Sequence, residues 1–505
     1  MEKLSLKTID RFKDIPGFSI PDQKITTLPE KALQFGTGVL LRGLPDYFID
    51  LANKQGLFNG RIVVVKSTSS GGTDDFNMQD GLYTQCIRGL DNNNKIEENI
   101  INASISRVLS AKDEWDEILL CAANENLSVV ISNTTEVGIQ LDKADRIDDA
   151  PPSSFPGKLL AALYARYKAF NGDLQKGLVI IPTELIVDNG EKLKSILVEL
   201  AAINMLPNAF IDWIRSANHF CSSLVDRIVP GKLPAEEKTA FEIRYNYSDN
   251  LIINSESYCL WAIEANDPKV NEILSFSKAH SGVVIAPDIT HFRELKLRLL
   301  NGSHTFSCGL AHIAGFTIVK EALDDQNLKD FITRLMKQEI APAITNKDLS
   351  IEDARDFSSK VIDRFRNPFI EHKWLSITVQ YSSKMKMRNI PTLLKHYEKS
   401  SGVPGCMALG FAAYILFMRC TEKDGVFTGS INGKQYIIQD DHASWYAEKQ
   451  GLSGKELVKV VLSDTSYWGS DLSLLPGFSE AVINDYGRLE KGNVIETIKE
   501  KLANR

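Results

Sequence analysis

A lysine, an asparagine and a histidine lie close together between positions 296 and 304. Lys296, Asn301 and His304 are separated by four and two residues in a largely apolar run. On a helix they span an arc of about 140°, at about 100° per residue, so their side chains can converge. A lysine in an apolar pocket has a lowered pKa and can exchange a proton near neutral pH, while asparagine can donate to a developing alkoxide and histidine can orient the lysine or the substrate. The spacing indicates an acid/base site, and a capped helix end with a structural histidine is the alternative.

The same stretch offers a second arrangement that involves a metal. His304, Cys308 and His312 recur every four residues, which is helical spacing for zinc ligands. The run matches no recognised ligand pattern, so we expect no catalytic metal.

A turn with two glycines could hold a phosphate group. Gly36-Thr37-Gly38 follows a short strand that ends at Phe35 and precedes a helical stretch over 39–53, where Pro45 is expected to introduce a kink. Glycines at such a turn let the backbone approach the pyrophosphate of a dinucleotide. Leu41 stands where the usual third glycine would be, so an ordinary turn between strand and helix is the alternative.

The next strand, over 62–65, bears on the choice of cofactor. It ends in Lys66, where NAD enzymes usually carry an acid that binds the ribose. A cation there can favour the 2′-phosphate of NADP, whereas a solvent-facing Lys66 would leave the ribose to Asp74 or Asp75. From these residues alone, the choice between NAD and NADP stays open.

The elements that position these residues alternate between strand and helix. Continuous apolar runs over 62–65, 129–131, 178–181 and 283–285 are typical of strands buried in a parallel sheet, and helical stretches over 159–170 and 191–203 separate them. After about residue 286 long amphipathic stretches dominate and strand-like runs are few. The pattern predicts an α/β protein with a loose lead-in over 1–30, a Rossmann-like doubly wound sheet domain over 31–286 and a mostly α-helical domain over 287–505.

Composition excludes several classes of protein. The 505 residues are 43% hydrophobic and 24% charged, which describes a globular enzyme, and the net charge of −7 without basic blocks argues against a nucleic-acid partner. Seven scattered cysteines fit a reducing cytosol. The polar N-terminus is unlike a signal peptide, and the longest apolar run, 407–418, is shorter than the roughly 18 residues of a membrane span. We expect a cytoplasmic protein with no membrane partner and leave its oligomeric state open.

The triplet at 296–304 resembles the K-x4-N-x2-H signature of the mannitol dehydrogenase family, the polyol-specific long-chain dehydrogenases. Five further segments agree with this family in order: Gly36–Arg42, Gln79–Thr84, Ser132–Gly138, Leu224–Pro230 and Arg364–Pro368. The resemblance implies a Rossmann domain, a helical domain, no catalytic metal, and Lys296 as acid/base with Asn301 and His304. It implies cofactor contacts from Phe35, Gly36, Thr37, Gly38, Val39, Leu40, Arg42, Lys66, Asn133 and Thr134.

Other stretches are most similar to the members of this family that act on sugar acids. They are Arg61–Thr68, Glu184–Gly190 and Ala217–Arg227. The resemblance therefore implies NAD-dependent reduction of a keto-uronate, with another keto-uronate or a neutral polyol as substrate alternatives. A dinucleotide-binding protein without turnover is the alternative from a different class.

Four residues are expected on the substrate side, namely Glu184, Asp226, His372 and Lys384. Mannitol dehydrogenases carry an asparagine where this chain has Leu185, in Thr183-Glu184-Leu185, and a leucine side chain cannot donate a hydrogen bond. A uronate carboxylate also needs a cation. Lys384 best matches the family's substrate side, within a basic stretch made up of Arg364, Arg366, His372, Lys373, Lys384, Lys386 and Arg388.

Overall fold

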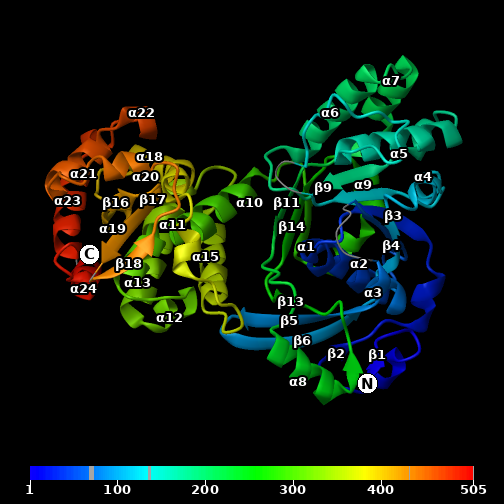
Figure 1. Cartoon of the computed structure of the whole chain (residues 1–505), viewed down its shortest axis with the longest axis horizontal. Helices are drawn as coiled ribbons and strands as arrows, with labels where there is room; N and C mark the ends of the chain where they lie inside the picture. The colour runs from blue at the N-terminus through cyan, green and yellow to red at the C-terminus, as the bar shows by residue number, and fades with distance from the viewer. Residues whose placement is uncertain (68–72, 135–137, 432, 504–505) are drawn as a thin grey trace. The chain divides into compact units, whose positions relative to one another are not determined.

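The computed structural model describes residues 1–67, 73–134, 138–431 and 433–503. Thr68, at the end of one quoted segment, and positions 135–137, within another, lie outside these ranges. The chain forms two compact units (Figure 1): unit 1 comprises Met1–Gly89 and Lys95–Ile289, and unit 2 comprises Leu90–Asn94 and Thr290–Arg505.

A six-stranded parallel sheet is the centre of unit 1. Its order is β10-β9-β8-β3-β4-β7, and every adjacent pair is parallel. The chain therefore starts in the middle, runs to one edge and returns to build the other half, which is the strand order of a dinucleotide-binding Rossmann fold. The predicted fold class is confirmed. The strands are β3 (Glu30–Phe35), β4 (Arg61–Lys66), β7 (Ile105–Ser110), β8 (Val129–Ser132), β9 (Val179–Pro182) and β10 (His219–Phe220).

Alternate residues of these strands enter two different cores. Ile62 and Val64 of β4 pack in one cluster, whereas Val63 and Val65 pack in the other. The second cluster is closed by α4 (Trp115–Ala122), α5 (Phe155–Ala169), α6 (Asn189–Ile203) and α7 (Asn208–Ala217). Burial of both faces explains why β4 reads as a continuous apolar run.

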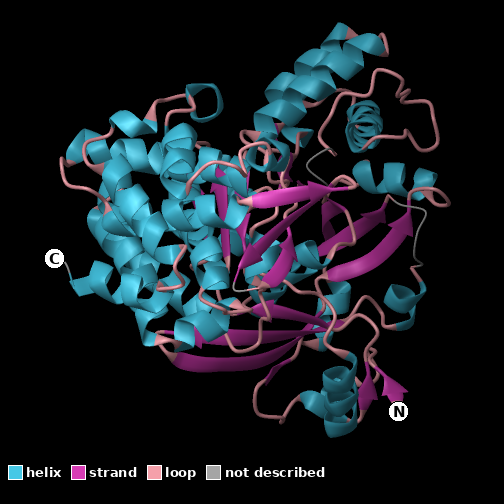
Figure 2. Ribbon diagram, turned by 60° about the vertical axis from the view of Figure 1, so that its left-hand side comes forward, coloured by secondary structure: helices cyan, strands magenta, loops and turns pink. Residues whose placement is uncertain are grey.

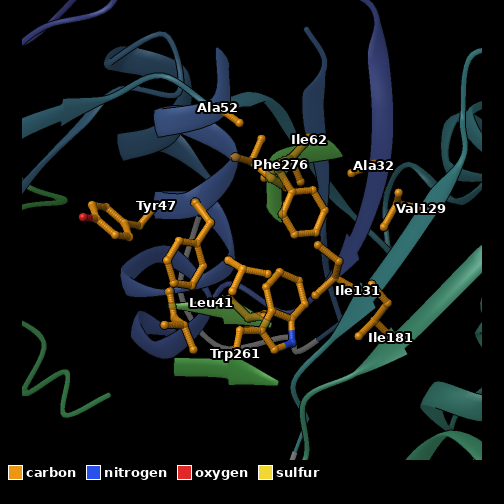
Figure 3. Packing of buried hydrophobic residues seen from close by; sticks show 14 of the residues in the cluster. Ala32, Leu41, Tyr47, Ala52, Ile62, Val129, Ile131, Ile181, Trp261 and Phe276 are labelled. Atoms are coloured by element: carbon orange, nitrogen blue, oxygen red, sulfur yellow. The ribbon is translucent and has the colours of Figure 1, made fainter. Parts of the chain in front are cut away.

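The opposite face is covered mainly by the helices that follow β3 (Figure 3). Leu41 of α1 (Val39–Gly43) and Tyr47 of α2 (Pro45–Lys54) lie in this cluster with Trp261 and Phe276. The single kinked helix expected over 39–53 is two helices in the structure. Leu44 breaks them apart with φ −135° and ψ −75°, and Pro45 begins α2 at a position where a missing N–H costs nothing.

Unit 1 also contains smaller sheets, which correct the sequence analysis at two points. The run 283–285 forms β15 (Val283–Ala286), which belongs to the three-stranded sheet β11-β14-β15 and not to the main sheet. The lead-in over 1–30 is built into the unit, since β1 (Glu2–Lys3) pairs with β12 (Tyr247–Ser248) and β2 (Phe18–Ser19) pairs with β6 (Asn94–Asn102). The remaining strands are β5 (Tyr83–Asp91), β11 (Ser223–Asp226), β13 (Ile253–Glu256) and β14 (Leu260–Glu264).

Unit 2 is predominantly helical, whereas most strands, magenta in Figure 2, belong to unit 1. The apolar run 407–418 lies in the buried helix α19 (Gly405–Met418). Across the described residues, no helix has the length and apolar character of a membrane span. Three π-helical segments interrupt the helices: η5 (Leu295–Gly302), η6 (Leu335–Ile340) and η7 (Met385–Asn389). A small antiparallel sheet is present as well, formed by β16 (Cys420–Lys423), β17 (Val426–Ile431) and β18 (Lys434–Ile437).

Candidate functional site

The carboxyl ends of β3 and β8 meet where the strand order of the main sheet reverses. In open α/β sheets this is the place where ligands bind. Gly36 follows β3 with φ +126°, and a Cβ atom there would lie 2.9 Å from the carbonyl oxygen of Asn133. Its N–H donates to the carbonyl of Val65 (3.0 Å). Because residues with a Cβ atom rarely adopt this φ, the turn needs glycine for its own geometry.

Gly38 lies two residues further on and differs from Gly36. It is exposed, its φ of −62° is open to any residue, and a Cβ atom there would meet no atom of the described chain within 4 Å. Nothing in the fold therefore requires glycine at this position, and the space beside it is open to a bound group.

Glu184 ties the end of β9 to the end of β8. One carboxylate oxygen accepts the backbone N–H and the hydroxyl of Thr134 (2.9 and 3.0 Å), and the other accepts the hydroxyl of Ser132 (3.1 Å). Asn133 donates to the side chain of Thr183 (2.9 Å). The structure thus brings together Gly36, Asn133, Thr134 and Glu184. Leu185, the residue that replaces an asparagine of mannitol dehydrogenases, is 61% exposed.

Phe35 and Arg42, which were expected to contact the cofactor, have their side chains inside unit 1. The ring of Phe35 lies against Phe155, with centroids 5.2 Å apart. Arg42 is buried, donates to the carbonyl of Leu251 (2.6 Å) and lies over the ring of Tyr83. Burial lowers the pKa of Arg42, although nearby acidic groups oppose this shift. The visible role of the Arg42 side chain is structural.

The remaining expected residues of unit 1 have mixed surroundings. Thr37, Val39 and Leu40 are partly buried, and the last two pack against the core. Lys66 is buried at the end of β4. Asp226 is buried at the end of β11, where it pairs with Leu260 of β14.

In unit 2 the signature lysine and asparagine lie on the π-helix η5. A π-helix closes each turn with hydrogen bonds between residues five apart. Lys296 and Asn301 are five apart, so the wider turn brings them nearer to one face than the 140° of an α-helix would. Lys296 is partly buried, and His304 follows on α11 (Ser303–Ile313).

Three contacts define the position of His304. Its ring stacks on Phe365 of α15 (Ile351–Phe365), meets His372 edge-on at 5.2 Å, and leaves Nε2 buried without a hydrogen-bond partner among the described residues. Burial holds the pKa of His304 well below 6.5, and the positive groups around it lower the pKa further. The imidazole is therefore neutral at physiological pH, with a nitrogen left for another molecule.

The cations that surround His304 include two residues four positions apart. Lys384, in α17 (Tyr381–Lys384), donates to the carbonyl of Ile377 (2.9 Å), and Arg388, in η7, donates to the hydroxyl of Thr305 (3.2 Å). Burial and then the charge of Arg388 lower the pKa of Lys384, and burial followed by Lys384 lowers that of His372. The structure thus groups His304, His372, Lys384 and Arg388, while Lys373 is exposed.

The alternative zinc ligands lie in separate surroundings. His304 faces Phe365, whereas His312 lies edge-on to Phe417 and Tyr436. Burial raises the pKa of the Cys308 thiol to about 12. Within the described ranges, no three His, Cys, Asp or Glu side chains are arranged to hold a metal ion.

Two contributing residues were not singled out from sequence. Arg298 donates to the carbonyls of Met387 and Arg388 (2.8 Å each) and so fastens η5 to η7. Thr305 donates to the carbonyl of Asn301 (2.8 Å) and accepts from Arg388. Both lie inside or beside the segment 296–304, and this proximity was the available signal.

Family models match both units. The mannitol dehydrogenase Rossmann domain matches residues 30–274, and the mannitol dehydrogenase C-terminal domain matches residues 288–490. These matches define the chain as an oxidoreductase that acts on CH–OH groups. It belongs to the mannitol dehydrogenase family.

Relatives with similar sequences span nearly the whole chain. An altronate oxidoreductase of Klebsiella pneumoniae is 39% identical over 490 residues, which are 95% of this chain and 96% of the relative. An altronate oxidoreductase of Shigella flexneri is 37% identical over 498 residues, 96% of this chain and 98% of the relative.

Solved structures agree on the fold. The mannitol 2-dehydrogenase of Pseudomonas fluorescens, in a ternary complex with NAD and D-mannitol, superposes with a TM-score of 0.71 at 22% identity and covers 100% of both chains. A substrate-free D-sorbitol dehydrogenase gives a TM-score of 0.76 at 19% identity, covering 99% of this chain and 100% of its own.

Proposed function

We propose that the chain is an NAD-dependent tagaturonate reductase, which interconverts D-tagaturonate and D-altronate in the breakdown of hexuronates. The observation that carries this proposal is the near-full-length identity of 37–39% to altronate oxidoreductases. The signature residues Lys296, Asn301 and His304 support turnover over mere dinucleotide binding.

The carboxyl edge of the main sheet suits a dinucleotide. Gly38 leaves open space at the reversal of strand order. The turn of Gly36 and Thr37 lies beside the segment of Asn133 and Thr134, since a Cβ atom on Gly36 would lie 2.9 Å from the carbonyl oxygen of Asn133. We assign these residues to the cofactor, with Phe35, Val39 and Leu40 contributing backbone, Arg42 supporting the turn from inside and Lys66 near the ribose. A bound nicotinamide dinucleotide would supply the hydride that the ketone carbon accepts.

Unit 2 supplies the proton and the groups that orient the substrate. In the direction of reduction Lys296 gives its Nζ proton to the ketone oxygen as this oxygen gains charge, so that C=O plus hydride plus proton becomes CH–OH. In the direction of oxidation Lys296 takes the hydroxyl proton. Asn301 donates to the same oxygen. Neutral His304, with its unpartnered Nε2, orients the reacting hydroxyl. We place Lys384 and His372 on the substrate side of unit 2, and Glu184 and Asp226 on that of unit 1.

A panel of substrates tests the proposal. NADH oxidation would be followed at 340 nm with D-tagaturonate, D-fructuronate and D-fructose, and each assay would be repeated with NADPH. We expect the highest kcat/KM with D-tagaturonate and NADH. A preference for D-fructuronate or D-fructose would identify a fructuronate reductase or a mannitol 2-dehydrogenase. A preference for NADPH would assign Lys66 to a 2′-phosphate, and cofactor binding without turnover of any substrate would reject the proposal.

A further inference from the structure

Arg388 is a half-buried cation, and its guanidinium makes few hydrogen bonds within the described chain. Its one hydrogen bond within the described chain runs from Nη1 to the hydroxyl of Thr305 (3.2 Å). That hydroxyl gives its proton to the carbonyl of Asn301 (2.8 Å), so it meets Arg388 with a lone pair. A guanidinium carries five N–H donors, and most of those of Arg388 have no acceptor among the described residues.

The backbone beneath this side chain is fixed. Arg298, itself buried, donates to the carbonyls of Met387 and Arg388 and is paired with Glu294 (3.4 Å). Glu294 also accepts from Lys395 (2.9 Å). Arg388 therefore projects from an anchored π-turn, and two hydrogen bonds connect it to the backbone of the signature asparagine.

The surroundings of Arg388 are positive. In the described ranges no carboxylate lies within ion-pair distance of Arg388 or Lys384. Asp440, whose charge acts on Lys384, accepts instead from the backbone N–H groups of Ser382 (2.7 Å) and His442 (2.8 Å). A partly desolvated cluster of cations without a counter-ion is costly unless an anion completes it.

We propose that Arg388 binds the carboxylate of the sugar acid and is the residue by which the enzyme distinguishes a sugar acid from a neutral polyol. The inference rests on the proposed function and deepens it. A guanidinium matches a carboxylate with two parallel hydrogen bonds, whereas an ammonium provides a single point of charge. Lys384 already donates to Ile377, so we assign it a supporting charge and transfer to Arg388 the anchoring role that the sequence suggested for Lys384.

The test compares two compounds that differ in one group. D-altronate and the hexitol with CH2OH in place of its carboxylate are offered to the wild type and to Arg388→Met, Arg388→Lys and Lys386→Met, with NAD as co-substrate. Lys386 is the matched control, since it is an exposed cation two residues away that lies over Tyr467. A melting temperature for each variant establishes that it is folded.

We expect Arg388→Met to lower kcat/KM for altronate by at least about a hundredfold, mainly through KM, and to change that for the hexitol by less than about threefold. Arg388→Lys should recover part of the loss, because it restores the charge but not the fork. Lys386→Met should leave both values unchanged. Equal losses on both compounds, or a folded Arg388→Met that oxidises altronate normally, would overturn the role of Arg388. A wild type that oxidises no sugar acid would overturn the proposed function instead.

Discussion

The imidazole of His304 lies flat against the phenyl ring of Phe365, with centroids 3.9 Å apart and planes 14° from parallel. This contact comes from two segments that the sequence places about sixty residues apart, the signature triplet and the Arg364–Pro368 motif. It fixes the plane of the imidazole in surroundings where its neutral form is strongly favoured.

The buried His304 should make the protein sensitive to acid. Its pKa is well below 6.5 in the folded chain and near 6.5 in the unfolded chain, so between these values only the unfolded chain takes up the proton. The contribution of the neutral ring to the free energy of unfolding is complete above about pH 6.5. It is lost as the pH falls towards the folded pKa, by up to about 1.4 kcal/mol per pH unit. Urea unfolding of wild type and His304→Phe between pH 7.5 and 5 would measure this, and the variant, which keeps the stacked ring, should have the shallower dependence. Parallel curves would contradict the assignment.

Gly36 and Gly38 should respond differently to substitution. Gly36→Ala places a side chain at φ +126° against Asn133 and should lower the free energy of unfolding by about 1–3 kcal/mol. A Cβ atom on Gly38 would meet no atom of the described chain within 4 Å, so Gly38→Val should leave stability nearly unchanged, yet raise the Kd for NADH more than about tenfold, a change of about 1.4 kcal/mol. Fluorescence titration together with thermal unfolding separates the two effects. Normal NADH binding by Gly38→Val would mean that the dinucleotide does not use this turn.

Glu184 should act on the edge of the sheet as well as on the substrate. Its carboxylate accepts three hydrogen bonds from Ser132 and Thr134. In glutamine an NH2 group replaces one of the two oxygens, and this donor would face the donors of Ser132 or Thr134. Glu184→Gln should therefore lower the free energy of unfolding by about 1–3 kcal/mol, measured by urea denaturation. Leu185→Asn, at an exposed position, is the matched control and should be neutral for stability. If Glu184→Gln is as stable as wild type but slower, its role lies with the substrate alone.

The architecture of unit 1 could largely be predicted from the sequence, because a strand that is buried on both faces is a continuous apolar run. The runs at 62–65 and 129–131 are apolar throughout, and both are central strands. The run at 283–285 has the same character but joins a different sheet, since an apolar run does not identify its pairing partner. The sheet β16-β17-β18 was missed, although Asp424-Gly425, both at positive φ, is a hairpin signal between its first two strands.

The residue types of the site in unit 2 could be predicted from the sequence, whereas much of its geometry could not. Lys296, Asn301 and His304 are visible as a spacing, but that spacing was interpreted on an α-helix. In the structure they begin on the π-helix η5, which packs against η7 and α15. The surroundings of His304 depend on Phe365 and His372, which only the tertiary fold brings near. The Arg388–Thr305–Asn301 chain of hydrogen bonds has no sequence pattern of its own.

Lys296 should control the chemical step and leave cofactor binding intact. Lys296→Ala removes the proton carrier and should lower the rate of ketone reduction by roughly 10²–10⁴-fold. The Kd for NADH, measured by fluorescence, should change little, because the groups assigned to the dinucleotide lie in unit 1. Turnover close to that of wild type would reject Lys296 as the acid/base.

The most direct test of the account follows the hydride itself. D-tagaturonate is incubated with NADH that carries deuterium at the transferring position of the nicotinamide, and the product is identified by NMR. The account predicts D-altronate with one deuterium on the former ketone carbon, and almost none of this product with Lys296→Ala. Unlabelled D-altronate, a different stereoisomer, or no reduction of D-tagaturonate while D-fructose is reduced would contradict it.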